Sequence, residues 1–295
     1  MPIAAASPAT SGQALAGGLV TSLLSAGIAL WPAPSAAQTM ASVGVDRPDF
    51  APTSKTGWLS SGTEFIALPS GPHPVTFDKA HPYVPNNRRQ QPTLRVADVN
   101  NPILQPWVVE ELKKVNERVL SGRAAFPPQV RCWPLGVPGF LLYPAQPVFF
   151  VQSPSEVSMI WQADHMVRRI FLTDRHSADL KPSWFGESIG HYEGGDTLVA
   201  DTIGLNTRTY VDNYRTPHTE KLHVVERFKL MPDAKGIEVT VTVEDPGAFT
   251  MPWSALQRYR RVDGGPIEEV TCAEGNFNYY NLELDPLPHA DRPDF

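Results

Sequence analysis

Thirty prolines among 295 residues constrain the fold of this chain more than any other feature. Proline removes a backbone donor and interrupts a helix interior, so this content is hard to reconcile with a mostly helical protein. Short strands joined by long ordered loops accommodate it better. Because 42% of the residues are apolar, the chain can bury one good core. We therefore expect one β-rich domain with appendages rather than two domains.

The second half of the chain shows the residue alternation of half-buried strands. From 237 to 244, apolar residues at odd positions alternate with polar residues at even positions. We expect strands at Val148–Gln152, Glu156–Gln162, Val167–Thr173, Thr197–Thr202, Leu222–Leu230, Ile237–Glu244, Ala255–Val262 and Ile267–Cys272, the last two forming a hairpin. The predicted fold class is mainly β, an antiparallel lipocalin-like barrel or a sandwich, with one N-terminal helix and long Pro-rich loops.

One helix is expected, at Gln105–Gly122. Pro106 suits its first turn, and Gly122 supplies a stop. We accordingly divide the chain into a signal peptide (1–37), an irregular N-terminal arm (38–104), the barrel domain with its leading helix (105–285) and a C-terminal tail (286–295).

The first segment of the chain has the pattern of a secretory signal. No charged side chain occurs before Asp46, and an apolar run is followed by small residues up to Ala37. The alternative is a disordered Ala/Ser-rich tail. Export predicts a periplasmic or secreted protein, and in that setting Cys132 and Cys272 would form one disulfide rather than remain two buried thiols. No later segment has the roughly 18 apolar residues of a membrane span, so we expect no membrane partner.

Glu226 is the most telling ionisable residue. A period-two reading of 222–230 places it on the same face as Val224 and Phe228. A carboxylate on an apolar face is costly unless it is paired or hydrogen-bonded. Enclosure would raise its pKa and suit a general acid or base, whereas an ion pair with an arginine such as Arg168 would be purely structural. Both readings stay open.

Other residues complete the candidate site. Three of them are assigned catalytic roles beside Glu226: His218, in a loop entering its strand, His191, and Arg168 as a clamp for an anionic group. A buried Asp201 could orient an imidazole or cap a turn. Substrate-binding roles are assigned to Trp161, Tyr192, Trp253, His223 and Asp201.

Several function classes are disfavoured. A net charge of −6 without a basic stripe argues against a nucleic-acid partner. No nucleophile elbow, phosphate loop or dinucleotide fingerprint occurs, so we expect no cofactor. No standard metal-ligand spacing occurs either, although His191, His218, His223 and Glu226 leave a metal-dependent hydrolase or lyase as an alternative.

The chain resembles a family of exported, largely uncharacterised bacterial proteins. Their SIGxWEGDTLVVDT and PHSEALHVVERY motifs correspond to Ser188–Thr202 and Pro217–Phe228, with Tyr192 in place of the usual Trp and one additional Gly in the turn after it. The family's VRxI strand and the Arg-His segment after it correspond to Val167–Ile170 and Arg175-His176. The resemblance implies export and the importance of these positions, and it brings no settled activity.

The site-level evidence favours a cofactor-independent lyase or isomerase. It would act by acid/base catalysis on a small, aromatic or phenolic molecule in a barrel pocket. A non-catalytic periplasmic carrier of small molecules is the first alternative, with Glu226 neutralised by a single arginine. The sequence leaves the oligomeric state open.

Overall fold

The computed structural model describes residues 47–82, 95–123, 128, 132–265 and 267–272. These residues belong to one compact unit, Gly44–Phe295. The predicted signal peptide at 1–37 and the predicted tail at 286–295 lie outside the described residues. Among the helices of the described part, none has the length and apolar character needed to cross a membrane.

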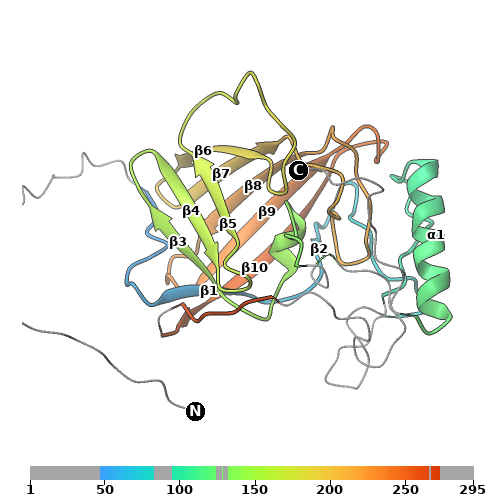
Figure 1. Cartoon of the computed structure of the whole chain (residues 1–295), viewed down its shortest axis with the longest axis horizontal. Helices are drawn as coiled ribbons and strands as arrows, with labels where there is room; N and C mark the ends of the chain where they lie inside the picture. The colour runs from blue at the N-terminus through green and yellow to red at the C-terminus, as the bar shows by residue number, and fades with distance from the viewer. Residues whose placement is uncertain (1–46, 83–94, 124–127, 129–131, 266, 273–295) are drawn as a thin grey trace, which may run out of the picture. The chain divides into compact units, whose positions relative to one another are not determined.

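Ten strands form one mixed sheet, so the predicted mainly-β class is confirmed (Figure 1). The strands are β1 (Thr56–Ser60), β2 (Ile66–Ala67), β3 (Val148–Gln152), β4 (Glu156–Trp161), β5 (Val167–Phe171), β6 (Glu187–Glu193), β7 (Thr197–Ile203), β8 (His223–Leu230), β9 (Gly236–Glu244) and β10 (Trp253–Asp263). Their order is β1-β3-β4-β5-β6-β7-β8-β9-β10-β2, and β1 also pairs with β10. The hydrogen-bonded order therefore returns to β1.

The two faces of the sheet differ as the alternation predicts. In β9 the side chains at 237, 239, 241 and 243 are buried, and those between them are partly or fully exposed. In β8 the buried positions are Val224, Glu226 and Phe228. We call the side that carries these residues the buried face and the opposite side the exposed face. Apolar burial on one face supplies most of the driving force for the sheet.

One pairing departs from the expected antiparallel arrangement. β5 and β6 run parallel, with Ile170 opposite Ser188 and Phe171 opposite Ile189. Parallel neighbours need a crossover between them, here residues 172–186, which we call the crossover segment. Gly190 lies in β6 where a Cβ would come within 2.5 Å of the Val199 carbonyl oxygen and 2.7 Å of Ile170 Cγ2. Only glycine permits this close packing of β5, β6 and β7.

Two other expectations were wrong. The arm predicted as irregular contains β1 and β2, and β1 pairs with the C-terminal half of β10 from Thr56↔Asp263 to Ser60↔Tyr259. The hairpin predicted after Asp263 is absent from the described residues, where Val270 makes only an isolated bridge with Ala163. Because β1 occupies the hydrogen-bonding edge of β10, no edge is left there for a strand at 267–272.

The predicted helix is α1 (Pro106–Leu120), with Pro106 at its first position and Gly122 at φ +86° just beyond its end. Val108 and Leu112 join the main core. The Trp107 indole nitrogen donates to the Gly247 carbonyl oxygen at 2.6 Å. The helix is thus anchored to the loop between β9 and β10.

A short 3-10 helix, η3 (Gly139–Leu142), is completely buried within the proline-rich loop before β3. The Leu141 carbonyl oxygen accepts hydrogen bonds from Ser60 of β1 at 3.0 Å and from Tyr259 of β10 at 3.1 Å. The Phe140 ring meets the Trp161 ring edge-on at 5.0 Å. Upstream, Cys132 forms the predicted disulfide with Cys272. η3 therefore covers part of the buried face of the sheet.

Candidate functional site

Glu226 and Arg168 form an ion pair on the buried face. Arg168 Nη1 donates to Glu226 Oε1 at 3.1 Å, and Nη2 bonds the other carboxylate oxygen. Glu226 is 0% exposed and Arg168 is 3% exposed. Burial raises the pKa of Glu226, while the charge and hydrogen bonds of Arg168 oppose the rise. This ion pair corresponds to the second of the two interpretations of Glu226 from the sequence, a structural pair with an arginine rather than a general acid or base.

Arg168 also binds the two strands that lie between β5 and β8. Its Nε donates to Ser188 Oγ of β6 at 3.1 Å, and its Nη2 donates to Thr202 Oγ1 of β7 at 2.8 Å. The Phe140 ring covers the guanidinium, with 4.9 Å from the ring centre to the guanidinium carbon. One side chain therefore links β5 to β6, β7 and β8. Within the described residues, Glu226 and Arg168 do not line the hollows of about 520, 300 and 460 Å³.

The predicted catalytic histidines lie away from this pair. His218 is buried, with Nε2 3.0 Å from Thr209 Oγ1 and Nδ1 3.0 Å from the Thr219 carbonyl oxygen. Desolvation by burial lowers its pKa, so the ring is neutral. His191 is on the exposed face, where Nε2 lies 2.9 Å from Glu193 Oε1. The structure thus brings Glu226 and Arg168 together and leaves both histidines outside their contacts.

The predicted binding aromatics are also dispersed. Trp161 packs against Phe140. Trp253 packs against Phe249 with ring centres 6.0 Å apart. The Tyr192 hydroxyl accepts a hydrogen bond from Gln152 Nε2 at 3.0 Å. Trp161 and Trp253 are thus part of the hydrophobic core, and Tyr192 is partly buried against it.

A second polar cluster lies on the exposed face, directly behind the first. Asp201 Oδ1 lies 3.1 Å from His176 Nε2 and 3.0 Å from His223 Nε2. Glu187 Oε1 lies 3.1 Å from His176 Nδ1. We call these four residues the exposed-face cluster. Its members come from the crossover segment, β7, β8 and β6.

The contacts of the two imidazoles differ. Both ring nitrogens of His176 lie within hydrogen-bond distance of a carboxylate, one of Glu187 and one of Asp201. Burial opposes ionisation of Glu187, but hydrogen bonds from Ser177 and His176 outweigh it and lower its pKa. His223 donates through Nε2 to Asp201. Its Nδ1 lies 3.9 Å from the Glu244 carboxylate, beyond hydrogen-bond reach.

The exposed-face cluster contains both predicted and unpredicted residues. Asp201 and His223 were expected to bind substrate. Asp201 contacts two imidazoles, but its side chain is 37% exposed rather than buried as expected. His176 and Glu187 were missed as site residues, although His176 lies in the Arg-His segment that carries the family resemblance. In the described part of the chain, no three or more His, Cys, Asp or Glu side chains are arranged to hold a metal ion.

A hollow of about 300 Å³ lies where β7 ends and β8 begins, and no residue of the exposed-face cluster lines it. Ile203, which is paired with Glu187, and Leu222, which precedes His223 in the chain, form one wall. Leu180 and Pro182 of the crossover segment form another. Glu220 and Lys221 complete the lining. A hollow that combines apolar walls with a few charged groups is typical of small-ligand sites.

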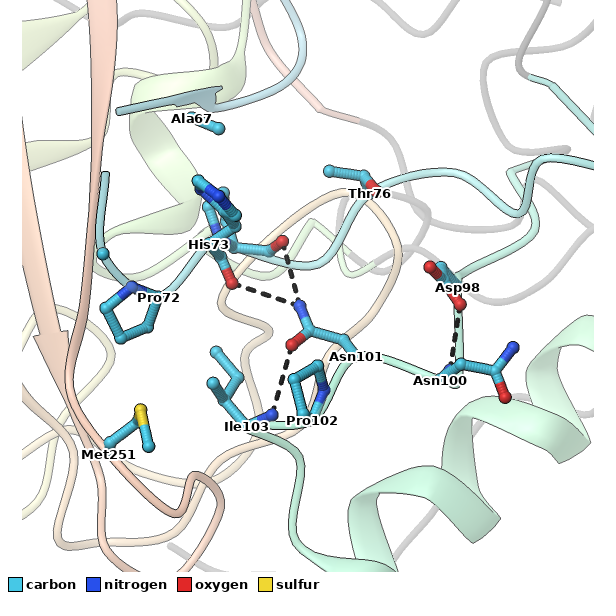
Figure 2. A pocket seen from close by; sticks show the side chains of 12 residues that line it. Ala67, Pro72, His73, Thr76, Asp98, Asn100, Asn101, Pro102, Ile103 and Met251 are labelled. Atoms are coloured by element: carbon cyan, nitrogen blue, oxygen red, sulfur yellow. Dashed lines mark hydrogen bonds between the residues drawn. The ribbon is translucent and has the colours of Figure 1, made fainter. Parts of the chain in front are cut away.

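Another hollow, of about 520 Å³, lies between the N-terminal arm and the segment before α1 (Figure 2). Asn101 holds its walls, because its side-chain nitrogen donates to the carbonyl oxygens of His73 and Pro74 at 3.1 and 3.2 Å. Met251 and Ile103 line its apolar side. No residue of the exposed-face cluster lines it.

A further buried polar network was not foreseen. Asp212 accepts hydrogen bonds from the Tyr214 nitrogen at 2.8 Å and from Thr216 Oγ1 at 2.7 Å. Burial raises the pKa of Asp212 to about 6. The Tyr214 hydroxyl donates to Glu64 of the N-terminal arm. This network fastens the loop between β7 and β8 to that arm.

Comparisons of the chain with family models, with curated proteins and with solved structures found no match.

Proposed function

We propose that the protein is a cofactor-independent lyase or isomerase in which His223 transfers a proton to and from a small substrate. The observation that carries the proposal is the pairing of His223 Nε2 with Asp201 at 3.0 Å. That bond fixes the tautomer and leaves the lone pair of Nδ1 directed away from Asp201. His223 is about one-third exposed, at 36%, so a substrate can reach it. A lone pair on an oriented imidazole is a suitable general base near neutral pH.

The remaining cluster residues act as positioning residues. Asp201 orients His223, His176 holds Asp201, and Glu187 holds His176. His223 would remove a proton from a substrate carbon atom next to a carbonyl group. An isomerase would return this proton to another atom of the substrate, and a lyase would deliver it to the leaving group. The sequence-based expectation of an aromatic or phenolic substrate is retained in this proposal.

The Glu226–Arg168 pair supports this site from the other side of the sheet. Glu187 and Ser188 are consecutive, as are Asp201 and Thr202, so in each pair one side chain reaches the exposed-face cluster and the other reaches Arg168. Arg168 thereby holds the backbone from which Glu187 and Asp201 project. Precise support of this kind is what positioned catalytic groups require.

The experiment is proton exchange with phenylpyruvate and a panel of small carbon acids in D₂O, followed by NMR. The protein should accelerate exchange, and His223→Gln should reduce the rate by about 10²- to 10⁴-fold, the range of general-base contributions. Asp201→Asn should reduce it as well, because the wrong tautomer of His223 would then be held.

His81→Gln is the matched control, because His81 is also an imidazole paired with a carboxylate, at 2.8 Å from Asp78, but lies in the N-terminal arm. It should leave the rate unchanged. An unchanged rate in a folded His223→Gln protein, or no acceleration with any carbon acid, would refute the proposal.

A carrier is the second candidate, because Glu226 is neutralised by one arginine as that hypothesis expects. The hypothesis also expects a roomy, mostly apolar cavity around Glu226, and Glu226 does not line the hollows of about 300, 460 and 520 Å³. Native mass spectrometry distinguishes the two. A co-purified molecule that stays unaltered on incubation would favour the carrier.

Two broader statements belong to the same proposal. The double pairing of β1 with β3 and β10 supports a lipocalin-like barrel. The Cys132–Cys272 disulfide supports a periplasmic or secreted location, because such bonds persist in oxidising compartments. The resemblance to exported bacterial proteins supports the same location. The segments that carry the resemblance also include three residues of the proposed site, His176, Asp201 and His223.

A further inference from the structure

Two adjoining hollows lie along the crossover segment. The first is the hollow of about 300 Å³ beside Ile203 and Leu222. The second, of about 460 Å³, is lined by Trp184 and Arg208 among others. Pro182 and Glu220 border both hollows, so we treat the two as one groove. Volumes of this size match those of small-molecule sites.

The groove has preformed walls. The Ser183 nitrogen donates to the Gly204 carbonyl oxygen at 2.9 Å, and the Asn206 nitrogen donates to the Ser183 carbonyl oxygen at 2.9 Å. These bonds fasten the crossover segment to the chain leaving β7. Gly204, at φ +71°, packs so closely that a Cβ would lie 2.5 Å from Leu180 Cδ2. A ligand therefore meets a surface that needs little ordering on binding.

The lining combines an aromatic side chain with charged side chains of both signs. The Arg208 guanidinium lies 5.8 Å from the centre of the Trp184 ring. Lys221 lines the hollow nearer to His223 and is exposed. Glu220 contributes one negative charge at the junction of the two hollows. The exposed ammonium group of Lys221 favours a ligand with a negatively charged group, and Glu220 disfavours a second one.

We propose that the groove binds a small aromatic monocarboxylate, with Lys221 attracting the carboxylate and Trp184 contacting the ring. The inference rests on the proposed function, because it assigns to this groove the binding of the substrate on which His223 acts. Glu220 accepts a hydrogen bond from a ring hydroxyl and repels a second carboxylate. Leu180, Pro182 and Ile203 supply apolar contacts to the ring.

The test is titration of the full chain with 4-hydroxybenzoate at low ionic strength, followed by calorimetry and tryptophan fluorescence. Binding should saturate and weaken with added salt. It should be about tenfold weaker for 4-hydroxybenzyl alcohol, which has the same ring without the charge, and for Lys221→Gln. Trp184→Leu should weaken binding about fivefold and remove most of the fluorescence change.

Lys235→Gln is the matched control, because it removes one positive charge from an exposed lysine that does not line the groove. It should leave the affinity unchanged. If Trp184→Leu fails to fold, Lys221→Glu replaces it and should abolish binding. No saturable binding, or equal affinity in the wild type and both Lys221 variants, would overturn the inference.

The two proposals fail in different ways. Binding that depends on Lys221 and Trp184, without proton exchange on any carbon acid, would reject the enzyme and retain the binding site. Exchange that depends on His223 but has the same KM in the Lys221 and Trp184 variants would reject the binding site and retain the enzyme.

Discussion

At the residue scale, neighbouring residues in two strands serve opposite sides of the sheet. Ser188 and Thr202 meet Arg168, while Glu187 and Asp201, each one position earlier, meet His176. Successive side chains of a strand point to opposite faces, so this division follows from strand geometry. The buried ion pair and the exposed-face cluster are therefore coupled through two short stretches of backbone.

Glu226→Gln should destabilise the protein by about 3–5 kcal/mol, because it leaves the Arg168 charge buried without its counter-charge. Urea unfolding measures this change. The double variant Arg168→Met with Glu226→Leu should recover much of the loss, since it removes both charges together. A Glu226→Gln protein that is folded at low temperature should retain more proton-exchange activity than His223→Gln. The reverse order would place the base at Glu226.

At the element scale, the crossover between β5 and β6 decides where the site lies. It carries His176 onto the exposed face and forms one wall of the groove. The parallel pairing it creates has only two registered residue pairs. Arg168 compensates for this short ladder by linking β5 to three following strands.

Gly190→Ala tests this junction. Its Cβ would meet the Val199 carbonyl oxygen, which is backbone and cannot rotate away, so β6 would have to separate from β7. We expect a loss of several kcal/mol in urea unfolding, comparable to other overpacked sites. Gly264→Ala is the control, since nothing lies within 4 Å of the place its methyl group would occupy, and it should change stability little. Equal stability of the two variants would contradict the tight packing of β5, β6 and β7.

At the scale of the whole molecule, contacts distant in sequence hold the chain together. β1 pairs with β10, η3 is hydrogen-bonded to both of these strands, and the disulfide joins Cys132 to Cys272 across 140 residues. Each of these contacts is made by a loop or arm that lacks strand or helix periodicity. The long proline-rich segments are thus part of the fold.

Replacing both cysteines by serine should lower the free energy of unfolding by up to about 5 kcal/mol, the loop-entropy value for a closed loop of this length. Thermal unfolding with and without reductant measures it. The wild type under reducing conditions should match the double variant. If reductant has no effect on the wild type, the bridge contributes nothing to stability.

Periodicity in the sequence was sufficient for α1, for the strands with clear alternation and for Glu226, but not for β1, β2, β6 or η3. Alternation gave β3 at its observed bounds and most of β4, β5, β7, β8, β9 and β10, and it placed Glu226 on the buried face. The stripe beginning at Val108 gave α1. β1 was missed because five residues with no clear alternation carry little signal. The hairpin after Asp263 was predicted from turn residues, which do not reveal that β1 already occupies that edge.

The sequence by itself determined α1, the strands with clear alternation and the side chains that those strands bury, because these follow from patterns within a few residues. It did not predict β1, β2, β6 or η3. Only the tertiary structure decided which strands are neighbours, that Arg168 is the partner of Glu226, and that His176 meets Asp201 and His223. Those contacts join residues tens of positions apart, and their formation depends on the packing of the whole sheet rather than on any local pattern.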